Sequence, residues 1–102
     1  LVQSGRVSGL PNDQHSVLHS NRAFAFLKMQ KWAAAEEDCS AGLDLNPRNT
    51  KAKFRRAWAR CELGEARAAL RDVDEVLEQL PDPSSNGEAV QMRQRIVEQL
   101  SE

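Results

Sequence analysis

The chain has 102 residues, a net charge of −1 at pH 7, and a composition that is 40% hydrophobic, 5% aromatic and 28% charged. These values are typical of one globular domain and leave too little chain for two. Because no window approaches eighteen consecutive apolar residues and the N-terminus has no basic lead, we expect neither a membrane span nor a signal peptide.

Helices are predicted along the first half of the chain. Residues 1–15 are rich in Ser, Gly, Pro, Asn and Asp, so we expect a loop there. A first helix is predicted over 14–29, where apolar residues recur at helical spacing without Gly or Pro. A second is predicted over 31–45 and ends before Pro47, because a proline ring cannot continue the helical hydrogen-bond ladder.

The same reasoning predicts two further helices in the middle of the chain. The third begins at Asn49 or Thr50, either of which is a suitable N-cap, and ends at Gly64. The fourth, over 66–80, has the most regular apolar period and ends at Pro81.

A surface turn and a last helix complete the prediction. The turn is expected over 81–87, where Ser85 and Glu88 have the spacing of a capping box. The fifth helix follows, to about residue 101. Since no segment alternates with period two, the predicted fold class is all-α.

The sequence matches itself at an offset of 34 residues. Small residues, charged residues and the prolines that end the second and fourth helices all take part. The identical pairs are Arg22/Arg56, Ala23/Ala57, Ala25/Ala59, Ala34/Ala68, Ala35/Ala69, Asp38/Asp72, Leu43/Leu77 and Pro47/Pro81. Chance similarity between alanine-rich helices would not also place the prolines that end the second and fourth helices at the same 34-residue offset.

Residues 16–83 therefore resemble the tetratricopeptide repeat family, whose unit is a 34-residue helical hairpin. The resemblance implies antiparallel hairpins stacked as a superhelix. It divides the domain, 16–102, into repeats at about 16–49 and 50–83 and a capping helix at about 85–101, with 1–15 as a loop or the remnant of a preceding repeat. The sequence departs from the family pattern at Gly42, Val76 and Arg60.

The sequence contains no constellation that predicts an enzyme, a metal site or a cofactor. His15 and His19 lie one helical turn apart without a carboxylate at metal-ligand spacing, and Glu36-Glu37-Asp38 is explained by solvation and the helix dipole. The two cysteines form no CxxC or Cys/His pair, so neither a zinc site nor a disulfide framework is expected. Because the sequence has no secretory signal and no Asn-X-Ser/Thr acceptor, we expect a reducing, cytoplasmic location. Because the chain begins with Leu, we expect a piece of a longer protein.

Charge is unevenly distributed, and the third helix is the basic part. Residues 47–71 carry eight basic and two acidic side chains, whereas 72–102 carry eight acidic and two basic ones. Lys51 and Arg55 are four residues apart on one helix face, and the repeat offset places Asn21 level with Arg55. Two cations and an amide on one groove wall would form a receptor for carboxylates.

This triple is similar to that of the carboxylate-clamp tetratricopeptide domains, co-chaperones that bind the acidic Glu-Glu-Val-Asp tail of 70- and 90-kilodalton heat-shock chaperones. The resemblance implies that Asn21 and Lys51 bind the terminal carboxylates and that Arg55 reaches an acidic side chain. The family clamp also takes a Lys and an Asn from a preceding helix. Residues 1–15 show no match to that helix, so the clamp is incomplete and its affinity should suffer.

Two aromatic residues belong to the same candidate site. Phe24 and Trp58 occupy equivalent positions on the groove side, either as an apolar wall for a Val or Met of the peptide or as packing against an absent helix. For the clamp triple, the alternative is a solvated basic face on which Arg22 and Arg56 pair with acids of the fourth and fifth helices.

Other functions remain as alternatives to a peptide-binding adaptor. One is a scaffold that binds another subunit, or self-associates through an N-terminal apolar face. Another is a targeting domain of a larger enzyme. Nucleic acid is not an expected partner, because the acidic stretch over 72–102 would repel phosphates.

Overall fold

A computed structural model of the chain describes residues 11–80 and 87–101. It contains five helices and, within those residues, no strand, so the all-α prediction is confirmed. The helices are α1 (Asn12–Lys28), α2 (Trp32–Leu45), α3 (Thr50–Glu62), α4 (Ala66–Gln79) and α5 (Gly87–Leu100). None of them is long and apolar enough to cross a membrane. The predicted helix stop at Pro81 and the capping serine, Ser85, lie outside the described residues.

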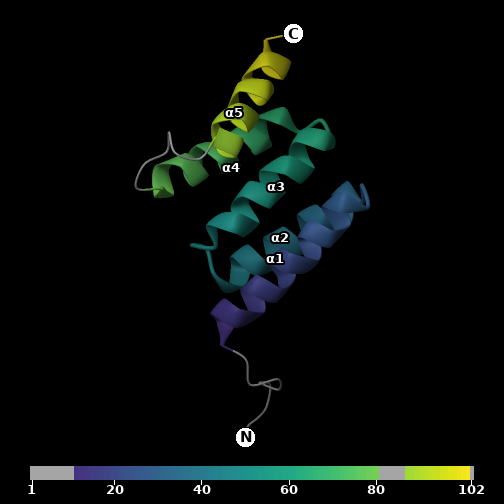
Figure 1. The fold of residues 1–102 in the computed structure, drawn as a ribbon, viewed down its shortest axis with the longest axis vertical. Coiled ribbons are helices and arrows are strands. Elements are labelled where there is room, and N and C mark those ends of the chain that lie inside the picture. The colour runs from purple at the N-terminus through teal and green to yellow at the C-terminus, as the bar shows by residue number, and fades with distance from the viewer. Residues whose placement is uncertain (1–10, 81–86, 102) are drawn as a thin grey trace, which may run out of the picture.

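The helices form two antiparallel hairpins and a final single helix (Figure 1). The first hairpin is α1–α2, the second is α3–α4, and α5 packs against α4 and α3. The third helix contacts all four others and therefore lies at the centre of the fold. This arrangement is the stack of hairpins that the repeat predicted.

The first helix begins earlier than predicted. It starts at Asn12 rather than at Gln14, so part of the expected 1–15 loop is helical. Pro11 occupies the N-cap position, where its missing N–H costs nothing because the first amides of a helix have no internal partner. Asp13 in the first turn favours this start through the helix dipole.

Polar contacts join the first hairpin to the start of α3. The side chain of Asn49 accepts a 3.0 Å hydrogen bond from the Ala52 amide, which makes Asn49 the N-cap of α3. Its amide nitrogen donates to Ser16 Oγ at 2.8 Å, and that hydroxyl donates to the Gly42 carbonyl at 2.6 Å. Ser16 is fully buried, so these bonds satisfy polar groups that water does not reach.

Each hairpin turns through one residue in the left-handed region. The first uses Gln30, with φ of 62°, and the second uses Gly64, with φ of 84°. The two positions are one repeat apart. The glycine adopts this conformation freely, whereas a side chain there costs about 1 kcal/mol. The predicted glycine stop is therefore confirmed, and Gln30 is its strained counterpart.

The apolar core is divided into two clusters. The first lies mainly within the α1–α2 hairpin and contains Ala23, Leu27, Ala35, Cys39 and Ala59. The second lies between α3, α4 and α5 and contains Ala57, Cys61, Ala69, Val73, Val76, Ala89, Met92 and Ile96. The indole of Trp58 packs against both.

Candidate functional site

A groove of about 470 Å³ lies where α3 meets α1, α4 and α5. Aromatic and aliphatic side chains form most of its surface, with two cations and one carboxylate among them. The lining residues are Phe24, Thr50, Lys51, Phe54, Arg55, Trp58, Val76, Leu80 and Glu88. Four of the five predicted site residues are thus brought together, and the fifth, Asn21, is not part of the lining.

Arg55 is held in the groove by polar and aromatic contacts. One guanidinium nitrogen donates to both oxygens of Ser20, at 2.8 Å to the carbonyl and 3.0 Å to the hydroxyl. The guanidinium also lies 4.6 Å from the centre of the Phe24 ring. Burial lowers the pKa of Arg55 from its usual value. Among the described residues no carboxylate pairs with it, so a partly desolvated cation faces the groove without an anion.

The aromatic wall of the groove joins the two hairpins. The rings of Phe24 and Trp58 are 6.5 Å apart between centroids and tilted by 60°. This geometry is typical of favourable aromatic pairs. Lys28 contributes a second cation, 4.7 Å from the Phe24 ring. Both aromatic side chains therefore line the groove and also pack against the core.

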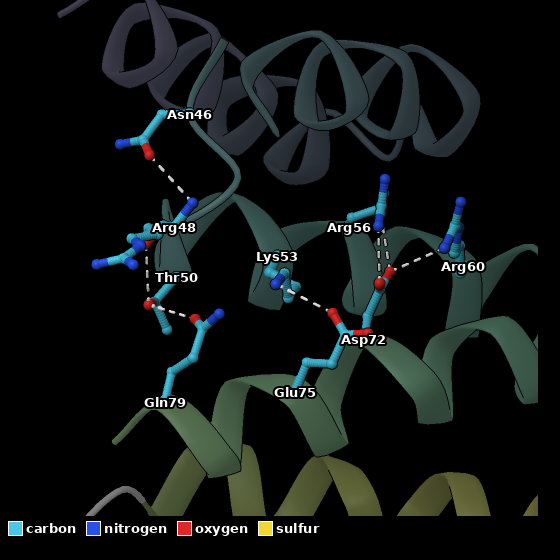
Figure 2. Close-up of polar contacts among 9 residues, drawn as sticks. All are labelled: Asn46, Arg48, Thr50, Lys53, Arg56, Arg60, Asp72, Glu75 and Gln79. Atoms are coloured by element: carbon cyan, nitrogen blue, oxygen red, sulfur yellow. Dashed lines mark hydrogen bonds and ion pairs between the residues drawn. The ribbon is translucent and has the colours of Figure 1, made fainter. Parts of the chain in front are cut away.

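Most other cations of α3 are neutralised by carboxylates of α2 or α4, and Figure 2 shows the pairs that three of them make with α4. Arg56 forms a two-bonded pair with Asp72, at 2.8 and 2.9 Å. Arg60 lies 2.9 Å from the same carboxylate and 2.7 Å from Glu36. The ammonium of Lys53 is 3.0 Å from Glu75, and Lys53 is buried. These residues serve packing between helices.

The same pairing occurs one repeat earlier. Arg22 makes two 2.7 Å hydrogen bonds to Asp38, and His19 Nδ1 lies 3.3 Å from that carboxylate. The prediction that Arg22 pairs with the fourth or fifth helix is wrong, because Asp38 in α2 is its partner. Asp38 and Glu36 are partners of arginines on neighbouring helices, which corrects the explanation of their cluster by solvation and the helix dipole.

Lys51 completes the positive part of the groove. Its side chain is exposed, and no described residue forms an ion pair with it. With Arg55 it lies on one face of α3, one turn apart. Lys51 and Arg55 are thus the groove cations that the described part of the chain leaves without a carboxylate partner.

Asn21 lies on α1 with an exposed side chain, three residues before Phe24. Residues three apart project from the same helix face, so Asn21 extends the wall that Phe24 begins. Asn21 is not among the residues that line the groove, and its position next to Phe24 follows from the helical spacing.

Several lining residues were not predicted. Phe54 belongs to the stripe formed by Lys51, Arg55 and Trp58 on α3, at helical spacing, and that spacing was a usable signal. Val76 comes from α4, Leu80 is the residue just after α4, and Glu88 comes from α5. Only the packing of the helices brings these residues to the groove.

The described residues provide no set of ligands for a metal ion. No group of three or more His, Cys, Asp or Glu side chains is placed to hold an ion there. His15 and His19 have ring centroids 6.4 Å apart, and both side chains are partly buried. What the lining of the groove offers a ligand is positive charge and an aromatic wall.

Known proteins similar to this chain were sought by sequence. No model of a protein family matches. Human RNA polymerase II-associated protein 3 is 37% identical over 94 residues, which are 91% of this chain and 14% of that protein. Human mitochondrial import receptor subunit TOM70 is 43% identical over 61 residues, 60% of this chain and 10% of that protein. The chain thus spans about a tenth of the length of these curated relatives.

Solved structures give a closer match in length. The first TPR of Spaghetti (RPAP3), bound to the HSP90 peptide SRMEEVD, is 38% identical with a TM-score of 0.80, covering 85% of this chain and 67% of that one. The second TPR domain of human RPAP3, in complex with the HSP70 peptide SGPTIEEVD, is 38% identical with a TM-score of 0.74, covering 80% and 66%.

Proposed function

The chain belongs to the tetratricopeptide repeat family, and on that premise we propose that it is an adaptor module that binds acidic C-terminal peptides of heat-shock chaperones. The observation that carries this proposal is the state of Lys51 and Arg55, two groove cations without a carboxylate partner among the described residues. Two solved relatives are complexes with chaperone peptides that end in EEVD. The chemistry of such a tail is complementary to this groove.

In the proposed complex the peptide lies extended across α3. Lys51 and Asn21 bind its terminal carboxylate, and Arg55 reaches an acidic side chain. Arg55 is already fixed by Ser20 and Phe24, so less rotational freedom is lost when an anion arrives. The apolar surface of Phe24 and Trp58 would receive a Val or Met of the peptide.

The proposal is tested by calorimetric titration with SRMEEVD, with its C-terminus either free or amidated. A charge-assisted hydrogen bond contributes about 1.5–3 kcal/mol, so amidation should weaken binding about tenfold or more. Lys51→Ala and Arg55→Ala should each lower the affinity for the peptide with a free C-terminus. Asn21→Ala should lower the affinity for that form only and leave the affinity for the amidated peptide unchanged.

Arg71→Ala is the matched control, because it also removes one exposed cation but lies on α4 away from the groove. It should leave the affinity unchanged apart from a small salt-sensitive loss. Equal affinity for the free and amidated peptides would show that no terminal-carboxylate site exists.

A second candidate function is assembly through α1. Val17 and Leu18 keep 50% and 54% of their surface exposed, and with Asp13 and Gln14 they line a shallow hollow. An apolar patch of this kind is suited to self-association or to another subunit. Light scattering after gel filtration at high concentration tests self-association, because a strict monomer would rule it out.

The two cysteines bear on the location of the chain. Cys39 and Cys61 are both buried free thiols, and burial raises the pKa of Cys39 to about 12, which keeps that thiol protonated. Free thiols are the state that a reducing compartment such as the cytoplasm maintains, and we propose that location for the chain. We assign no catalysis to the chain, and an adaptor of this size would target whatever longer protein carries it.

A further inference from the structure

The groove continues beyond its cationic part. A second hollow of about 360 Å³ opens between α3 and α5, lined by Phe54, Trp58, Glu62, Glu88, Gln91, Met92 and Arg95. Phe54, Trp58 and Glu88 line both hollows. Because three side chains are shared, the two hollows form one trough that runs from α1 across α3 to α5.

The sign of the charge reverses along this trough. The part next to α1 contains Lys51 and Arg55, Glu88 lies where the two hollows meet, and the part next to α5 adds Glu62 and a single cation, Arg95. Arg95 lies 3.8 Å from Glu62, at the limit of an ion pair. Glu88 is exposed and has no ion pair with any described residue. It is therefore the carboxylate that remains available in the second hollow.

The direction of the proposed peptide follows from these charges. Its C-terminal carboxylate and acidic side chains belong at Lys51 and Arg55, so its N-terminal residues run toward α5. A residue there meets the aromatic surface of Phe54 and Trp58 and then the carboxylate of Glu88. The aliphatic stem of an arginine or lysine packs on such a surface while its charged end reaches a carboxylate.

We propose that Glu88 selects tails that carry a basic residue on the N-terminal side of their acidic residues. This inference rests on the proposed function, because it takes the acidic end of the tail to be bound at Lys51 and Arg55. It distinguishes two tails that share EEVD: SRMEEVD has an arginine before its acidic pair, and SGPTIEEVD has no basic residue. The chain should therefore prefer the first.

A double-mutant cycle between protein and peptide tests the inference. The peptides are SRMEEVD, SAMEEVD and SEMEEVD, and the proteins are the native chain, Glu88→Gln and Glu88→Lys. Exposed ion pairs are weak, so replacing the arginine by alanine should lower affinity about two- to fivefold on the native chain. Glu88→Gln should bind SRMEEVD and SAMEEVD equally, and Glu88→Lys should reverse the order of SRMEEVD and SEMEEVD.

Glu98→Gln is the matched control, since Glu98 is an exposed carboxylate of α5 that lines neither hollow. It should keep the native preference. If the affinity ratio of SRMEEVD to SAMEEVD is the same on the native chain and on Glu88→Gln, the inference is overturned. Binding that depends on the terminal carboxylate is not contradicted by that result. If the native chain binds free and amidated SRMEEVD equally, the proposed function fails and this inference fails with it.

Discussion

Asp38 and Asp72 are buried carboxylates at equivalent positions of the two hairpins, and each holds the arginine that lies sixteen residues before it. Removing the arginine would leave the buried carboxylate without compensation, which costs more than the pair itself contributes. The pKa of Arg56 is raised above its usual value chiefly by its hydrogen bond to Asp72. These pairs therefore fix the distance between the helices of each hairpin.

The lowered pKa of Asp38 leads us to predict a specific dependence of stability on pH. The hydrogen bond from Arg22 is the main cause that holds the pKa of Asp38 below its ordinary value of 3.8, and His19 contributes in the same direction. Because the folded state has the lower pKa, the stabilisation is present above pH 3.8 and is lost as the pH falls through the folded value.

Urea denaturation of the native chain and of Asp38→Asn, at pH 7 and at pH 3, measures this effect. The native chain should lose more free energy of unfolding between the two pH values than the variant does. Asp44→Asn, an exposed position on the same helix, is the control and should retain the native pH dependence. A variant at Asp38 with an unchanged pH dependence would contradict the assignment.

At the scale of helices, close approach between neighbours decides which residues are tolerated. Gly42 in α2 faces the start of α1, and a Cβ added there would lie 3.1 Å from the Ser16 carbonyl oxygen and 3.4 Å from the His19 Cβ. Ser16 also makes the hydrogen bonds that connect α2 and Asn49, so it cannot move without loss. The helices are therefore packed to the limit that glycine allows.

Gly42→Ala should destabilise the chain by about 1 kcal/mol, because crowding of about 1–3 kcal/mol exceeds the gain of about 0.5–1 kcal/mol in helix propensity. Urea denaturation checks the value. Gly87→Ala is the comparison: a Cβ at Gly87 meets nothing within 4 Å, so that substitution should be neutral or stabilising. Greater stability of Gly42→Ala would show that α1 moves away at little cost.

Periodicity and the 34-residue match were enough to predict the helices, because each depends on apolar spacing within one segment or on an internal copy of it. The 34-residue match also identified Arg22/Arg56 and Asp38/Asp72 as equivalent pairs. It did not indicate which carboxylate forms an ion pair with each arginine. Lys53 and Glu88 show where prediction from the sequence ends. Lys53 is buried against Glu75, and Glu88 is brought to the trough by α5. Both outcomes depend on packing between segments distant in sequence.

At the scale of the whole molecule, the buried apolar side chains form two cores, and α3 contributes residues to both. Leu27 belongs to the first and Ile96 to the second, and each is almost completely buried. Arrays of this kind have stabilities that add from repeats and from the contacts between neighbours. The two ends of the molecule therefore need not open together.

Hydrogen exchange on two core variants tests this division. Leu27→Ala should remove about 2–5 kcal/mol from the first core and speed exchange mainly in α1 and α2. Ile96→Ala should act mainly on α4 and α5. Uniform acceleration in both variants would instead indicate a single cooperative unit.

Trp58 has a consequence for how this surface can evolve. Its indole packs against both cores and lines both hollows of the trough. A substitution that reshapes the contact with a bound tail therefore also alters the joint between the hairpins. Changes of specificity are consequently easier to acquire at the charged rim, at Lys51 or Glu88, than at this tryptophan.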